Sequence, residues 1–118
     1  MPNAPISTRT VTIKSGQSQS EPVDLTGQIL VGIRIPASGW SSNAALTFLH
    51  TPDLTGTFKS VYTATGSELQ VTIGIADSEI RDIPELNFSG FIKLRSGTAQ
   101  TPVNQGADRA IELVLRSA

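Results

Sequence analysis

Apolar side chains recur at every second position along most of the chain, which is the period of a β-strand rather than of a helix. The apolar residues of the clearest stretches are Val11 and Ile13; Ile29, Val31, Ile33 and Ile35; Leu46 and Phe48; Leu69, Val71, Ile73 and Ile75; Ile92 and Leu94; and Ile111, Leu113 and Leu115. Weaker alternation covers residues 20–25 and 57–63. The pattern therefore predicts about eight short strands.

Glycine and proline separate these stretches and mark turns between them. The turn signals are Ser15-Gly16, Thr26-Gly27, Ser38-Gly39, Thr55-Gly56, Thr65-Gly66 and Ser96-Gly97, with Pro36, Pro52, Pro84 and Pro102 nearby. No segment has a sustained helical pattern, although one helical turn is expected at residues 83–88, where the alternation breaks. Evenly spaced strands with polar turns predict an all-β, antiparallel sandwich, and eight strands in two sheets would form a jelly roll.

The chain has 118 residues, a length that suits a single domain. Residues 1–8 contain Pro2 and Pro5 and only Ile6 as a sizeable apolar anchor after the first residue, so we expect an extended arm there. Fully stretched, such an arm would reach roughly 25 Å, enough to lie across a neighbouring subunit. Residues 9–118 would then form the sandwich domain. The expected interface residues are Pro2, Asn3, Pro5 and Ile6 of the arm, together with Trp40.

Composition excludes several classes of function. The chain has no cysteine and one histidine, which removes disulfide scaffolds, thiolate zinc sites and multi-histidine metal sites within one chain. Nine basic and ten acidic residues give a net charge of −1, so there is no basic surplus for nucleic acid. The apolar stretches are far shorter than the roughly 20 residues that span a bilayer. The first residues also lack the charged head and apolar run of a signal peptide.

The sequence contains few candidates for catalytic residues. His50 follows the strand pattern of Leu46 and Phe48, so we expect a strand-end histidine beside the core rather than a general base. Asp77, Glu79 and Asp82 form the densest carboxylate cluster. They are candidates for acid–base work or for a structural calcium ion, and the alternative is a group of solvated turn residues. We therefore expect no enzyme activity and no cofactor.

Aromatic and basic residues leave two further possibilities open. Trp40, the only tryptophan, lies in a polar loop, and Tyr62 lies on a weak strand; either ring could stack on a sugar, or Trp40 could close one end of the sandwich. Lys93 and Arg95 share the outward side of their strand with an aromatic residue, as a nucleic-acid surface would require. A cross-strand ion pair with Glu112 is the simpler interpretation.

Several segments together resemble a family of small proteins encoded among the structural genes of tailed bacteriophages and prophages. They are GWSSNAALTF at residues 39–48, GTFKSVY at 56–62, FIKLRSGT at 91–98, PVNQ at 102–105 and the terminal strand at 109–116. The resemblance covers roughly residues 16–116 and consists of strands and turns without a catalytic signature. The shape is also similar to galactose-binding and carbohydrate-module jelly rolls.

The resemblance implies a virion component on the capsid surface, a head decoration or cement protein. The implied partners are the major capsid protein and copies of the chain itself, in a trimer or another homo-oligomer, without nucleic acid or membrane. The alternatives are a carbohydrate-binding or host-adhesion module that uses Trp40, and a head–tail or tail structural component. Copy number per particle separates a decoration protein from a connector.

Overall fold

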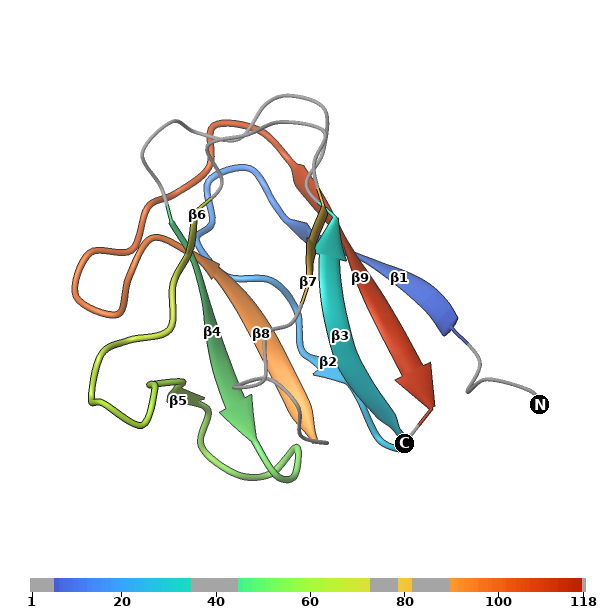
Figure 1. Cartoon of the computed structure of the whole chain (residues 1–118). Coiled ribbons are helices and arrows are strands. Elements are labelled where there is room, and N and C mark those ends of the chain that lie inside the picture. Colours follow the sequence, from blue (N-terminus) through green and yellow to red (C-terminus); the bar gives the residue numbers. More distant parts are fainter. Residues whose placement is uncertain (1–5, 35–44, 73–78, 82–89, 118) are drawn as a thin grey trace.

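The computed structural model of the chain describes residues 6–34, 45–72, 79–81 and 90–117 (Figure 1). These residues contain nine strands and no helix. The strands are β1 (Ile6–Ile13), β2 (Val23–Asp24), β3 (Gln28–Arg34), β4 (Ala45–Thr51), β5 (Lys59–Ser60), β6 (Val71–Thr72), β7 (Glu79–Arg81), β8 (Phe91–Ser96) and β9 (Arg109–Ser117). The expected all-β class is therefore confirmed for the described part of the chain.

The strands form two sheets in which every pairing is antiparallel. The four-stranded sheet has the order β1-β9-β3-β7, and the five-stranded sheet has the order β2-β8-β4-β5, with β6 also paired to β4. Consecutive strands mostly lie in different sheets, because the chain crosses between the sheets after β1, β2, β3, β6, β7 and β8. As a result, the last strand lies between the first and third strands (Figure 1).

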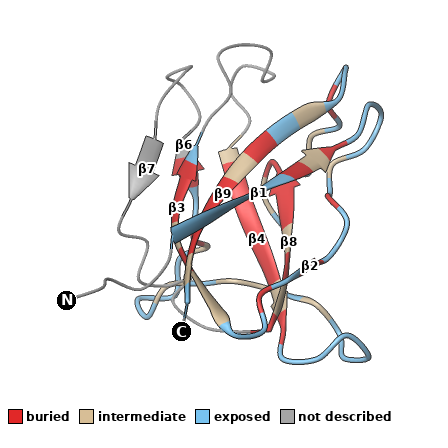
Figure 2. Ribbon diagram, turned by 90° about the vertical axis from the view of Figure 1, so that its right-hand side faces the viewer, coloured by how far each residue is buried: buried red, intermediate tan, exposed pale blue. Residues whose placement is uncertain are grey.

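One hydrophobic core lies between the two sheets, and both sheets contribute to it. The four-stranded sheet supplies Val11, Ile13, Leu30, Ile33, Ile111, Leu113 and Leu115, and the other sheet and its connections supply Val23, Leu25, Leu46, Phe48, Leu69, Val71, Ile92 and Leu94. Figure 2 shows the buried residues concentrated along β3, β9, β4 and β8. The predicted inward positions in the described strands are confirmed except at β3, where Ile29 and Val31 are only half-buried and a bulge shifts the register between Leu30 and Gly32.

One boundary in the chain differs from the expected one, and one expectation is not tested by the described residues. Strand β1 begins at Ile6, and its first three residues pair with Arg116, Leu115 and Val114 of β9. Residues 6–8 therefore belong to the sheet and not to an arm, because their backbone groups lie beside the long terminal strand. The helical turn expected at residues 83–88 lies outside the described residues.

Candidate functional site

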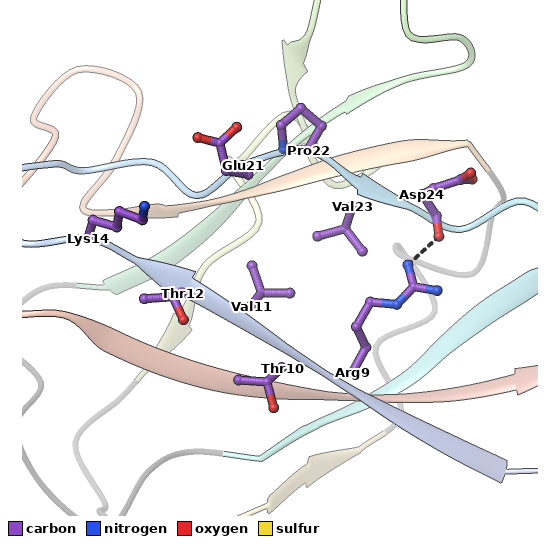
Figure 3. Close-up of a pocket in the computed structure, with 9 residues that line it drawn as sticks. All are labelled: Arg9, Thr10, Val11, Thr12, Lys14, Glu21, Pro22, Val23 and Asp24. Carbon is purple, nitrogen blue, oxygen red and sulfur yellow. Dashed lines mark hydrogen bonds between the residues drawn. The ribbon is translucent and has the colours of Figure 1, made fainter.

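A cleft of about 420 Å³ separates the edges of the two sheets where β1 faces β2 (Figure 3). Strand β1 is the outermost strand of the four-stranded sheet, and β2 is the outermost strand of the other sheet. The cleft is lined by Arg9, Thr10, Val11, Thr12, Lys14, Glu21, Pro22, Val23 and Asp24. It is thus built entirely from β1, β2 and the residues next to them.

Val11 and Val23 point toward one another across the cleft and form its apolar floor (Figure 3). Both belong to the hydrophobic core and are buried. They face inward because each lies on the side of its strand that faces the opposite sheet. Thr10 and Thr12 also line the cleft, but their side chains point away from β2 (Figure 3).

Hydrogen bonds from Arg9 link the two sheet edges at one end of the cleft. Arg9 Nη1 donates to the backbone oxygen of Asp24 at 2.6 Å, and Nη2 donates to Gln28 Oε1 at 3.4 Å. Gln28 Nε2 in turn donates to Ser7 Oγ at 3.3 Å. Ser7 lies in β1, so Gln28 contacts two residues of that strand. The guanidinium is therefore directed toward β2 and away from the solvent-facing side of the strand.

The charges around the cleft balance one another. Arg9 and Lys14 contribute two positive charges, and Glu21 and Asp24 contribute two negative charges. Hydrogen bonding from the Thr26 side chain lowers the pKa of Asp24, as does the Thr26 backbone N–H, which donates to Asp24 Oδ1 at 2.8 Å, and the charge of Arg9 lowers it further. Asp24 is consequently a carboxylate at neutral pH, and the cleft has no charge surplus to attract an ion.

Strand β1 also offers a long open edge. Its residues 6–10 are all exposed, and Ile6 is 61% exposed. The register with β9 runs without a break from Ile6 to Ile13, so β1 has no bulge, and it has no proline. Among the described residues, no strand pairs with its other side. The other outermost strands are short: β7 has three residues, and β2 and β5 have two each.

The structure places few of the predicted site residues. Pro2, Asn3, Pro5 and Trp40 lie outside the described residues, and only Ile6 of the predicted interface is seen, as the first residue of β1. Asp77 and Asp82 also lie outside them. Glu79 is not in a turn, because its backbone forms the start of β7 opposite Arg34. Among the described residues there is no group of His, Asp or Glu side chains that could hold a metal ion.

His50 lies near the end of β4 and is half-buried, as predicted for a strand residue beside the core. Its ring is close to the backbone of Gly90: a Cβ atom at Gly90 would lie 2.9 Å from His50 Nε2. Gly90 has a φ of 121°, which glycine adopts readily. The histidine is thus part of the junction between β4 and the start of β8.

The cross-strand ion pair expected between Glu112 and Lys93 or Arg95 is wrong. Strand β8 belongs to the five-stranded sheet and β9 to the other, so Glu112 lies on a different sheet from Lys93 and Arg95. Glu112 instead pairs with Arg34 across neighbouring strands, at 3.1 Å between Oε1 and Nη1. Arg95 is buried and pairs with Glu68. Sequence reasoning missed Glu68 because it lies in a connection without a strand pattern.

The Arg95–Glu68 pair is the centre of a polar network on the outer side of the five-stranded sheet. Arg95 Nε donates to Thr47 Oγ1 at 3.0 Å, and its Nη2 donates to Ser60 Oγ at 3.1 Å. Glu68 also accepts from the backbone N–H of Ala99, at 3.1 Å to each carboxylate oxygen. The network therefore ties β8 and β4 to the connection between β5 and β6 and to the loop after β8.

Neighbouring residues cover more of this outer side. Lys93 Nζ lies 4.7 Å from the centre of the Phe58 ring, a cation–π contact. Lys93 and Arg95 are thus both engaged with the segment that follows β4, which disfavours the nucleic-acid interpretation of these two residues. Tyr62 remains 51% exposed.

Comparison with known proteins adds no family to these observations. No family model matches the chain, and no curated protein or solved structure matches it. Within the described part of the chain, no helix has the length and apolar character that crossing a membrane requires.

Proposed function

We propose that the chain is a structural protein of a bacteriophage virion, a capsid decoration protein that binds and stabilises the assembled head. The observation that carries the proposal is the open edge of β1 beside a charge-balanced cleft. The backbone groups of a long regular edge strand can pair with a strand of another polypeptide, and monomeric proteins normally protect such an edge. The exposed side chain of Ile6 adds an apolar contact at the start of that edge.

We further propose that the two sheets form a jelly roll. The strand orders β1-β9-β3-β7 and β2-β8-β4-β5 support this, because successive strands alternate between the sheets and the last strand lies between the first and third. Jelly rolls are common in viral capsid proteins and in lectins. The fold is thus compatible with a virion role, and the role itself is argued from the β1 edge.

The proposed partners are the major capsid protein and further copies of the chain. Residues 1–5 precede β1 in the sequence, so contacts made by Pro2, Asn3 and Pro5 would continue the surface that begins at Ile6. Each contact of a decoration protein can be modest, because many copies bind one shell and neighbouring copies reinforce one another. The location that we propose for the chain is therefore the capsid surface.

A binding assay with capsids from the genome that encodes the chain tests the proposal. Purified protein should sediment with the capsids and saturate their surface. Replacing the exposed apolar side chain in Ile6→Ser should weaken binding about tenfold, because burial of an isoleucine side chain contributes on that scale. Leu54→Ser is the matched control, since Leu54 is 58% exposed and Ile6 is 61% exposed, and it should bind like the unmodified chain.

Absence of saturable capsid binding would contradict the proposal. A glycan array provides the outcome that favours the carbohydrate alternative. Specific glycan binding that is lost in Tyr62→Ala or Trp40→Ala, together with no capsid binding, would replace the decoration function with an adhesion function.

A further inference from the structure

We infer that two copies of the chain pair through the open edge of β1, antiparallel to one another, around a two-fold axis at Thr10. The inference names a surface for the self-association included in the proposed function and rests on that part of it. Edge strands that must avoid such pairing are short, charged, bulged or interrupted by proline. In the described residues β1 has eight residues, an unbroken register and Arg9 as its single charge, and that charge is directed toward β2.

Two hydrogen bonds at the end of β1 indicate which backbone groups face the open side. Ser15 donates its backbone N–H to Asp108 Oδ1, next to the start of β9, at 2.8 Å. Lys14 uses its carbonyl in the turn that follows, accepting from Gln17 N at 3.0 Å. Because backbone groups alternate along an antiparallel ladder, the odd residues of β1 face β9 and the even residues face outward. The side chains alternate with the same period: Val11 and Ile13 are buried, whereas Thr8 and Thr10 are exposed.

A two-fold axis perpendicular to the sheet keeps each side chain on its own face, and registers centred on Thr8, Arg9 and Thr10 differ in which residues lie opposite one another. A register centred on Arg9 places two guanidinium-bearing side chains directly opposite one another, which is unfavourable. A register centred on Thr8 pairs only residues 6–10 of each copy with one another. A register centred on Thr10 pairs residues 7–13 of β1 with one another, so it forms a longer ladder than the Thr8 register and avoids the contact between the two Arg9 side chains.

The Thr10 register is also complementary in its side chains. Thr10 lies opposite its own copy and Thr8 lies opposite Thr12, so threonines face one another along the outer side, a pairing that stabilises sheets. Arg9 lies opposite Val11. No like charges meet, and the two four-stranded sheets become one continuous sheet of eight strands. The contact is isologous, as a two-fold interface requires.

The absence of cysteine allows a direct test, because one introduced thiol per chain reports on one position. In the Thr10 register, the Cα atoms of the two Thr10 residues lie about 5.5 Å apart. Thr8 of one copy lies opposite Thr12 of the other, so the two Thr8 residues are offset by four residues, roughly 13 Å along the strands. Thr10→Cys should therefore form a covalent dimer with a short thiol-to-thiol crosslinker, and Thr8→Cys should not. Efficient crosslinking of Thr8→Cys but not of Thr10→Cys would overturn the register.

A proline variant tests the interface without a crosslinker. The N–H of Thr10 faces outward, so Thr10→Pro removes a bond to the second copy and none to β9; Thr10→Val keeps the N–H and the branched shape. Sedimentation of the purified chain should show a dimer whose dissociation constant rises about 100-fold in Thr10→Pro, through the loss of two symmetric hydrogen bonds, and little in Thr10→Val.

A circular dichroism spectrum shows whether the proline variant is folded. If it is not folded, the crosslinking of Thr10→Cys tests the interface independently. A folded Thr10→Pro that dimerises like the unmodified chain would overturn the inference, as would an unmodified chain that is monomeric at all concentrations. Both measurements use the protein alone, so a failure here is distinct from a failure of capsid binding.

Discussion

At the scale of single residues, Arg95 and Glu68 are the most constrained charges in the described part of the chain. Their side chains are only 5% and 9% exposed, and each has further hydrogen-bond partners. A buried pair contributes less than its Coulomb attraction suggests because both charges leave water. Removing one partner is costly, however, since the other charge then stays buried without compensation. The buried Arg95–Glu68 pair and the exposed Arg34–Glu112 pair should therefore differ in their effect on stability.

We expect Glu68→Gln to lower the free energy of unfolding by about 3 kcal/mol, because Arg95 would keep its buried charge without a carboxylate. Glu112→Gln is the matched control. Its pair with Arg34 is much more exposed, with side-chain exposures of 56% for Arg34 and 36% for Glu112, so the loss should stay below about 1 kcal/mol. Denaturant unfolding of both variants measures the difference, and equal losses would show that the buried network does not support the fold in this way.

Asp53 provides a prediction about pH. The Thr55 hydroxyl, which donates to Asp53 Oδ1 at 2.6 Å, lowers the pKa of Asp53. Because the folded-state pKa lies below the unfolded one, this interaction stabilises the fold above the unfolded pKa, and the stabilisation is lost as the pH falls through the folded value. Thr55→Val should raise the pKa of Asp53 toward its ordinary value. An NMR titration of the side-chain carboxyl carbons measures this.

Asp24 is the internal control for that titration. Its pKa is lowered chiefly by hydrogen bonding from Thr26, in a different turn, so Thr55→Val should leave it unchanged. If the pKa of Asp53 does not move while the chain stays folded, the hydroxyl is not what holds the carboxylate in its charged form.

At the scale of elements, alternation of apolar residues was sufficient to locate the strands that build the core. The segments around Val11, Ile33, Phe48, Leu94 and Leu113 all form strands as predicted. Alternation was less informative at strand ends, because ladder bonds continue through polar residues that leave no apolar signal. Strand β1 thus begins at Ile6 among serine and threonine, and β7 forms from Glu79–Arg81 by pairing with β3.

The start of β1 gives a prediction at this scale. Deleting residues 1–5 keeps all the described pairs between β1 and β9 and should change the free energy of unfolding by no more than about 0.5 kcal/mol. Deleting residues 1–8 also removes the pairs of Ile6, Ser7 and Thr8, including the two bonds expected between Ser7 and Leu115, and should cost about 2 kcal/mol. Denaturant unfolding compares the two. Equal stability of both truncations would contradict this prediction, because it would mean that the pairing of residues 6–8 with β9 does not stabilise the fold.

At the scale of the whole molecule, the candidate site depends on topology that one sequence does not contain. The cleft forms because β1 and β2, neighbours in the chain, end up on the edges of different sheets. The sequence could identify Ile6 as an exposed contact, but it could not show that Arg9 would turn toward Asp24 and leave a row of threonines on the open edge. Nor could it separate β8 from β9, which is why the pairing of Arg95 was misassigned.

The same topology links the fold to the proposed role. The two sheets enclose the hydrophobic core. The polar network around Arg95 holds loops against the five-stranded sheet, and the hydrogen bonds of Arg9 join the two sheet edges. Among the described strands, β1 has the longest open edge, and an edge of this kind can pair with another polypeptide, as the proposed role requires. A decoration protein uses such a surface many times on one particle.

The copy number of the chain in purified virions tests the central claim most directly. Quantitative mass spectrometry with labelled peptide standards gives the ratio of this chain to the major capsid protein. A decoration protein that covers the head should be present in a fixed ratio near the number of capsid subunits or a simple fraction of it, in the hundreds per particle. A count of about a dozen or fewer, as for a connector or tail component, or absence from the particle, would contradict the account.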